Sequence, residues 1–305
     1  MELKLNIEQK VVAKVESINK GNHFFNCNCL LVNGKQINIK FFDPKQEISV
    51  GQLYEFKVII ERKDEEEIIS GLEANLANKV LDNEKLSEIL PKFFQYAPIG
   101  LTQLKKEIEF YLSRIKNPIL GKITRKIYND NKDKFFLHPA GTRFHHAYLG
   151  GLAYHTITML KMVRPFLENY KHLDKDLLYS GIILHDMSKL DEITGVEGEY
   201  TKAGLLLGHL VMQTVDIGKV ASKYGYEDKE EVLLLKHIVI SHHGQLQFGS
   251  AKKPMVPEAL LIWYLDTIDS KFRALEEQLE KTKEGEFTTN IPALDKSRFY
   301  KKSFK

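Results

Sequence analysis

Features that mark secreted or membrane proteins are scarce in this sequence. Its 305 residues include only two cysteines, Cys27 and Cys29. Their C-x-C spacing places both on one face of a strand, where a disulfide would be strained. No run of about 18 or more apolar residues is present, and the N-terminal stretch MELKLNIEQKVV lacks the apolar segment of a signal peptide. We therefore expect a cytoplasmic protein with reduced, buried thiols and no contact with a membrane.

The chain as a whole has almost no excess of charge of one sign, with 44 basic and 41 acidic residues. The net charge of +3 is too small to identify a partner. Residues 102–134 are an exception, with nine basic and four acidic side chains. Such a segment is either a solvated helical face or a surface that follows a phosphate backbone.

The first 75 residues are rich in β-branched and aromatic residues and are divided by turn residues. Asn33-Gly34 is a strong signal for a two-residue hairpin. The pattern predicts five short strands, at 10–18, 24–32, 35–42, 52–60 and 66–73. Five strands in so short a segment suit an OB-type β-barrel, which we place at residues 1–80.

From about residue 80 the apolar residues recur at helical spacing. We expect a helical extension with a basic face at residues 81–140, followed by an all-α domain at residues 141–305. The fold class is thus α+β and multidomain, with a barrel followed by a helical bundle.

Histidines and aspartates are concentrated on the apolar helices of the second half. A single histidine on an apolar helix is usually a satisfied core residue, but burying several such groups unpaired would cost several kcal/mol each. A shared cation removes that cost, and imidazole with carboxylate suits Mn²⁺, Fe²⁺, Co²⁺, Ni²⁺ or Zn²⁺. The candidate ligands are His155, His185, Asp186, His209, His242, His243 and Asp266.

The order H…HD…H…HH…D resembles the HD-domain superfamily of metal-dependent phosphohydrolases. The chain more narrowly resembles the YhaM-type 3′→5′ exoribonucleases, which join an N-terminal OB-fold to a C-terminal HD domain. The segments that carry the resemblance are FHHAYLGGLAYHT, ILHDMSKLDE, EYTKAGLLLGHL, ISHHGQLQFGS, PEALLIWYLDTIDSK and GEFTTNIPALDKSRFYKK.

The resemblance implies two divalent ions, most readily Mn²⁺. One ion would be held by His155, His185, Asp186 and Asp266, and the other by Asp186, His209, His242 and His243. The two oxygens of a carboxylate can span two cations, so Asp186 fits the bridging position. Lys189 would either contact a substrate phosphate or pair with Asp186. Asp269, one turn after Asp266, is expected to support a ligand rather than be one.

The function implied is hydrolysis of single-stranded RNA, and of single-stranded DNA as a further possible substrate, to nucleoside 5′-monophosphates. Two alternatives remain open: a phosphodiesterase of small or cyclic dinucleotides, and a nucleic-acid-binding protein without catalysis. The candidate substrate contacts are Lys189, Arg143, His145 and His146 in the helical domain and Phe25 and Phe41 in the barrel. Assembly into a homo-oligomer is compatible with the sequence.

Overall fold

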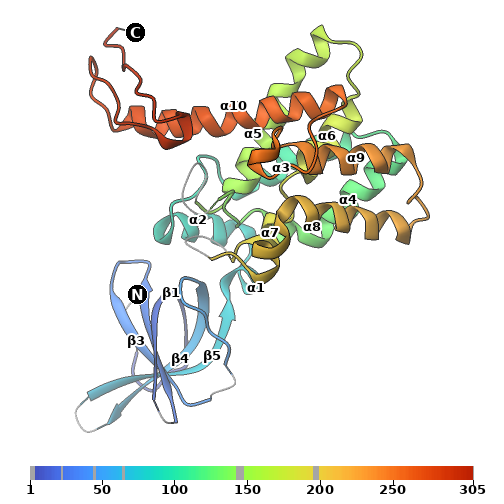
Figure 1. The fold of residues 1–305 in the computed structure, drawn as a ribbon. Helices are drawn as coiled ribbons and strands as arrows, with labels where there is room; N and C mark the ends of the chain where they lie inside the picture. The colour runs from blue at the N-terminus through green and yellow to red at the C-terminus, as the bar shows by residue number, and fades with distance from the viewer. Residues whose placement is uncertain are drawn as a thin grey trace. The chain divides into compact units, whose positions relative to one another are not determined.

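The computed structural model describes residues 4–21, 23–43, 46–63, 66–141, 148–194 and 199–304. The chain divides into two compact units, a barrel unit at Met1–Gln95 and a helical unit at Tyr96–Lys305 (Figure 1). Within the described ranges, none of the helices combines the length and the apolar character needed to cross a bilayer.

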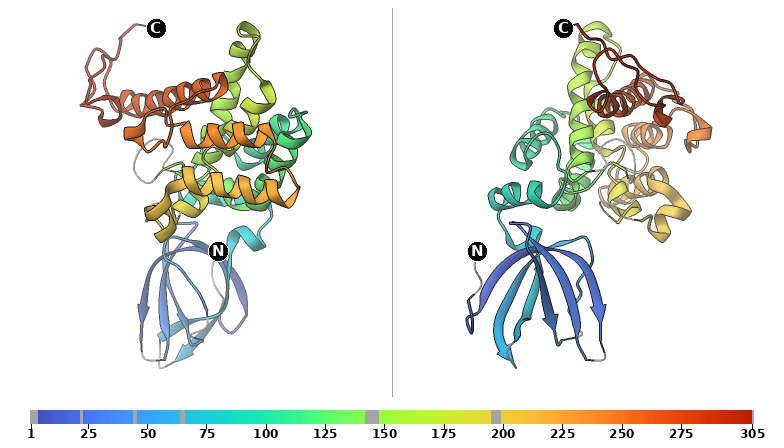
Figure 2. Two further views of the ribbon diagram at one scale, coloured as in Figure 1. Left: turned by 45° about the vertical axis from the view of Figure 1, so that its right-hand side comes forward. Right: turned by 90° about the vertical axis from the view of Figure 1, so that its left-hand side faces the viewer.

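The barrel unit contains five strands that close into a barrel in the order β1-β2-β3-β5-β4. Its strands are β1 (Gln9–Lys20), β2 (Phe25–Leu31), β3 (Gln36–Phe41), β4 (Leu53–Lys63) and β5 (Glu66–Leu76). All neighbours are antiparallel except β3 and β5, and the two ends of the sheet meet where β1 pairs with β4. Gly34 adopts a φ of 80° in the β2–β3 turn, as the Asn-Gly signal predicts. The expected OB-type barrel is confirmed (Figure 2).

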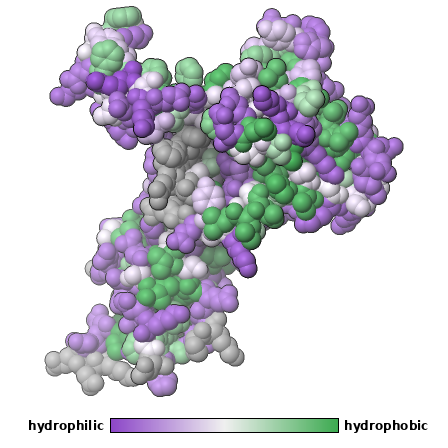
Figure 3. All heavy atoms as spheres, in the orientation of Figure 1, coloured by the Kyte–Doolittle hydropathy of each residue, from purple (hydrophilic) through white to green (hydrophobic). Residues whose placement is uncertain are grey.

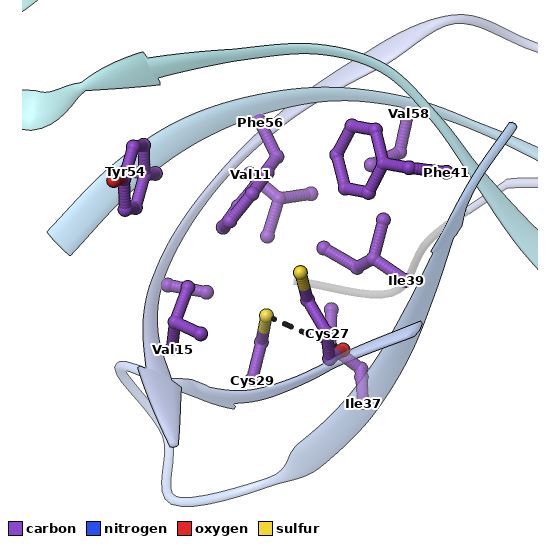
Figure 4. Close-up of a cluster of buried hydrophobic side chains, with 11 residues drawn as sticks. Val11, Val15, Cys27, Cys29, Ile37, Ile39, Phe41, Tyr54, Phe56 and Val58 are labelled. Atoms are coloured by element: carbon purple, nitrogen blue, oxygen red, sulfur yellow. Dashed lines mark hydrogen bonds between the residues drawn. The ribbon is translucent and has the colours of Figure 1, made fainter. Parts of the chain in front are cut away.

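Alternate residues of each strand fill the barrel interior, because side chains in a strand point to opposite faces. Figure 4 shows the thiols of Cys27 and Cys29 inside this core, among aliphatic and aromatic side chains. Both cysteines are free and fully buried, as expected. Burial raises the pKa of the Cys27 thiol to about 11 and that of Cys29 to about 12.

The prediction that Phe41 faces substrate is wrong. Phe41 is 1% exposed and its ring lies inside the barrel, whereas Phe42 is 57% exposed. Gly71 of β5 makes room for Phe41, because a Cβ atom at this glycine would lie 2.3 Å from the Phe41 ring. Phe25 is half-buried and stacks on Phe41 with ring centroids 5.2 Å apart. Phe25 thus extends the core, and its contact with substrate stays a prediction.

The helices that follow the barrel divide between the two units. Helices α1 (Ala77–Val80) and α2 (Asn83–Phe93) lie in the barrel unit. Asp82 caps α2 by accepting a hydrogen bond from the Lys85 backbone N–H at 2.8 Å. Helices α3 (Leu101–Ser113) and α4 (Pro118–Phe135) belong to the helical unit, since their apolar faces pack on its later helices.

The basic segment 102–134 therefore covers part of a packed bundle. Its polar face is only partly free, because Lys126 pairs with Asp130 and Arg125 donates to the Leu112 carbonyl. Contact of this face with phosphates stays a prediction.

The core of the helical unit includes α5 (Gly151–Asn169), α6 (Lys175–Leu184), α9 (Glu230–Ser241) and α10 (Pro257–Glu280). Helices α6 and α10 contact each other, and both contact α5 and α9. Helix α8 (Lys202–Lys223) packs against α9, and the short helix α7 (Lys189–Glu192) packs against α8. Two 3-10 turns follow, η1 (Leu246–Phe248) and η2 (Pro292–Leu294). Figure 3 shows apolar patches among the polar surface of this unit, and the most exposed apolar residues of α8 are Leu205 and Leu206.

Three interruptions in the expected helices position the functional residues. Helix α5 begins only at Gly151, after Gly150 with a φ of 76°. Helix α6 ends at Leu184, directly before the His-Asp pair. Gly208 breaks α8 with a φ of 70° and a ψ of 158°, one residue before His209.

Candidate metal centre

Asp186 lies in the turn between α6 and α7. His185 is the C-cap of α6, and Lys189 begins α7, with its backbone N–H donating to the Asp186 carbonyl at 3.0 Å. His185 and Asp186 are 0% and 3% exposed. The turn places an ionisable pair in the middle of the helical unit, where it needs polar partners.

The two carboxylate oxygens of Asp186 face two different groups of histidines. Oδ2 lies 3.3 Å from His185 Nε2 and 3.9 Å from His155 Nε2. Oδ1 lies 3.3 Å from His209 Nε2 and 3.6 Å from His242 Nε2. One carboxylate is therefore shared by two clusters of potential ligands.

These clusters define two candidate ion sites. In the first ion site, one ligand atom each of His155, His185 and Asp186 lies within 4.8 Å of the others. In the second ion site, the same holds for Asp186, His209, His242 and His243.

Asp266 lies beside the first ion site, with Oδ1 3.3 Å from His155 Nε2. It does not belong to the mutually close group of three. The structure thus brings the candidate ligands together, with Asp266 at the margin.

Each histidine of the centre is oriented by a hydrogen bond at its Nδ1 atom. An Nδ1–H that donates to an acceptor leaves Nε2 with a lone pair for an ion. All five Nε2 atoms can therefore serve as ligands. The acceptors are Asp269 Oδ2 for His155 (2.6 Å), the Ile182 carbonyl for His185 (2.7 Å), Glu192 Oε2 for His209 (2.9 Å), the Val239 carbonyl for His242 (2.7 Å) and the Phe248 carbonyl for His243 (2.8 Å).

Several of these polar atoms are buried without a hydrogen-bond partner. Across the described parts of the chain, Asp186 Oδ1, His209 Nε2 and His242 Nε2 are buried atoms that make no hydrogen bond. Leaving such groups unsatisfied is costly, and a cation between them would satisfy all three at once. The donor set of imidazole nitrogens and carboxylate oxygens fits a first-row divalent ion.

The electrostatics of the centre reflect this crowding of charge. Burial opposes ionisation of Asp186, yet Lys189 and His185 hold the pKa of this carboxyl well below its usual range. Burial also opposes protonation of His155, but the carboxylates of Asp266 and Asp269 outweigh it and raise the pKa to about 10. Burial and the neighbouring His242 lower the pKa of His243 to about 4. The His243 ring is therefore neutral and ready to ligate near pH 7.

Lys189, which the sequence predicts to contact either substrate or Asp186, also lies in the centre. Its Nζ lies 2.8 Å from Asp186 Oδ2, and its side chain is 17% exposed. It pairs with the Asp186 carboxylate, one of the two roles expected from the sequence. Arg143, His145 and His146 lie outside the described residues.

Glu192 orients a candidate ligand and is not among the residues that the sequence predicts for the site. It is 6% exposed, and its Oε1 accepts the backbone N–H of His209 at 3.0 Å. This N–H is available because Gly208 breaks the helix before it. Gly204 lets α8 approach α7, since a Cβ there would lie 2.4 Å from the Glu192 carbonyl oxygen. The signal in the sequence is Gly208, directly before His209. A glycine there allows the helix to break, and the break leaves the His209 backbone N–H to be satisfied by another residue.

Comparison with known families agrees with this geometry. Residues 152–271 match the family model described as the HD domain, and this range contains every candidate metal ligand. No solved structure matches the chain. The helical unit thus contains an HD domain, which indicates a metal-dependent phosphohydrolase, and HD domains bind divalent metals. Together with the barrel, the chain joins an OB-like β-barrel to a phosphohydrolase domain.

Proposed function

We propose that the protein is a metal-dependent 3′→5′ exoribonuclease that hydrolyses single-stranded RNA to nucleoside 5′-monophosphates. The observation that carries the proposal is the carboxylate of Asp186, whose two oxygens face two separate histidine clusters. That arrangement suits a two-ion phosphodiesterase, and no other nucleophile is required.

In this proposal Asp186 is the residue that both ions share. The first ion site would be completed by His155, His185 and Asp266, and the second by His209, His242 and His243. When bound, the ions, most readily Mn²⁺, supply Lewis acidity that activates a water molecule and offsets the charge of the phosphoryl group.

The chain's own residues hold the ligands and receive the substrate. Asp269 and Glu192 fix the rings of His155 and His209, so their Nε2 atoms keep one direction. Lys189 is close enough to the centre to exchange its contact with Asp186 for a contact with a phosphate oxygen of RNA. A lysine in that position binds the phosphate as a point charge.

The barrel is the feature that favours a polymeric substrate over a small nucleotide. Barrels of this type commonly bind single strands by stacking bases on aromatic side chains. A phosphodiesterase of dinucleotides would need the same metal centre but not this unit.

The test is incubation of the protein with Mn²⁺ and a 5′-labelled single-stranded RNA, with cyclic and linear dinucleotides in parallel. The proposal predicts a ladder that shortens from the 3′ end and is abolished by EDTA. Cleavage of dinucleotides without a ladder would replace the proposal with the small-nucleotide alternative. Binding without cleavage would leave only a nucleic-acid-binding role.

A matched pair of histidine variants controls this assay. His242→Ala removes a buried ligand of the second ion site, and His172→Ala removes an exposed histidine between α5 and α6. We expect the first variant to lose the ladder and the second to keep it.

A further inference from the structure

Most candidate ligands of the metal centre are closed off from solvent, and His243 is the partly exposed ligand of the second ion site. The side chains of His185, Asp186 and His242 are at most 4% exposed. In the group that forms the second ion site, the other three members are buried and His243 is half-buried. A substrate at this ion site would therefore lie beside the residues that surround the His243 ring.

The turn that follows His243 is fixed beside this ring by its backbone. The Phe248 carbonyl accepts a hydrogen bond from His243 Nδ1 at 2.8 Å, and the Phe248 backbone N–H donates to the Gln245 carbonyl at 3.0 Å. Gly244 has a φ of 75°, and a Cβ atom there would lie 2.0 Å from the Trp263 ring. The turn thus keeps its place at the second ion site without use of the Phe248 ring.

The side chains that this turn presents are apolar and exposed. Phe248 and Leu246 are each 60% exposed. Leu207, which is two residues before His209, is 54% exposed. The rings of His209 and His243 have centroids 5.1 Å apart, so exposed apolar residues adjoin two neighbouring ligands. Apolar surface beside a polar metal centre suits a substrate that carries a flat apolar group close to its phosphate.

We propose that the Phe248 ring stacks on the nucleobase of the nucleotide whose phosphate reaches the metal centre. Stacking suits this ring, since every base has a π-face and the contact needs no hydrogen bond. A further phosphate would find no cation on the turn, because residues 244–249 read GQLQFG. The inference rests on the proposed function, which brings a nucleotide to the centre, and adds a residue that selects for the base.

The test compares binding of adenosine 5′-monophosphate (AMP) and ribose 5-phosphate to the full chain in Mn²⁺, by isothermal titration calorimetry. The two ligands share ribose and phosphate and differ in the base. We expect the wild type to bind AMP about 10-fold more tightly. Phe248→Ala should lose this preference and bind ribose 5-phosphate as the wild type does. Phe248→Trp should keep the preference, because an indole also stacks on a base.

Two controls separate the ring from the turn that carries it. Phe272→Ala removes a ring of α10 that is 67% exposed, and it should bind both ligands as the wild type does. Equilibrium dialysis of Phe248→Ala should show unchanged Mn²⁺ binding, because the backbone carbonyl of Phe248, and not its ring, orients His243.

The inference is overturned if the wild type binds the two ligands equally, if Phe248→Ala keeps the preference for AMP, or if Phe248→Trp loses it. Loss of Mn²⁺ or ribose 5-phosphate binding in Phe248→Ala would also overturn it, since the residue would then only shape the turn. The proposed function fails separately. A preference for AMP that depends on Phe248 would stand without an RNA ladder, and a ladder without that preference would remove only the stacking contact.

Discussion

Glu192 holds His209 by two hydrogen bonds, one from the ring Nδ1 at 2.9 Å and one from the backbone N–H at 3.0 Å. Glu192→Gln keeps the size of the side chain but leaves a single acceptor oxygen for two donors. We expect it to weaken Mn²⁺ binding at the second ion site by about 10- to 100-fold. Equilibrium dialysis against Mn²⁺ would measure the two binding constants.

Asp269→Asn is the matching control, because Asp269 supports His155 in the first ion site. It should weaken the first ion site and spare the second. An equal loss of Mn²⁺ affinity at both ion sites in either variant would contradict this. It would show that Glu192 and Asp269 stabilise the fold as a whole and do not orient individual ligands.

Metal binding should stabilise the helical unit, because it satisfies buried atoms that lack hydrogen bonds. At a free Mn²⁺ concentration about 100 times Kd, one site adds about 2.7 kcal/mol to the free energy of unfolding. Thermal denaturation with Mn²⁺ should give a higher midpoint than denaturation with EDTA. The same midpoint in both, while dialysis shows bound Mn²⁺, would contradict a site formed only in the folded protein.

Phe41 and Phe42 are neighbours with opposite roles. Phe41→Ala should cost about 3–5 kcal/mol of barrel stability, because it empties part of the core. Phe42→Ala should cost under about 1 kcal/mol, because its ring is exposed. Hydrogen exchange of barrel peptides would measure both changes. Similar protection in the two variants would show that β3 does not place Phe41 in the barrel interior.

The thiols of Cys27 and Cys29 should resist modification in the folded protein. Burial raises their pKa values to about 11 and about 12, so little thiolate is present at pH 8. Ellman's reagent should react slowly with the native protein and with both thiols once guanidinium unfolds it. Rapid reaction of either thiol in the native state would mean that the barrel opens at β2.

Lys189 pairs with Asp186 Oδ2 at 2.8 Å, so its substitution separates two roles. If its ammonium contacts substrate, Lys189→Gln lowers the rate of RNA cleavage by about 10- to 100-fold. Ion binding should be retained or tightened, since a competing cation is gone. Loss of bound Mn²⁺ in this variant, measured by dialysis, would show that Lys189 serves only to position the carboxylate.

The barrel could be predicted from the sequence because alternation, turn signals and strand length all indicate it. The face of the sheet that each aromatic residue occupies could not be predicted. A shift of the strand register by one residue would put Phe42 in the interior in place of Phe41. The deciding contact is Gly71, which is distant in sequence and makes room for only one of them. Which unit each helix after the barrel joins could not be predicted, because helical periodicity alone does not show which unit a helix packs on.

The candidate ligands could be predicted because their residue types and order are distinctive. Their supports depend on tertiary contacts that no local pattern encodes. Glu192 reaches His209 across 17 residues, and Asp269 reaches His155 across 114. The turn at Asp186 and the break at Gly208 interrupt segments whose apolar spacing predicts continuous helices.

Asp186 is expected to be shared by two ion sites. The direct test is the Mn²⁺ content after equilibrium dialysis of the wild type, Asp186→Asn, His185→Ala and His243→Ala. We expect two ions in the wild type, one in each histidine variant, and weakened binding of both ions in Asp186→Asn. Loss of a single ion in Asp186→Asn, with the other bound as tightly as in the wild type, would contradict the bridge.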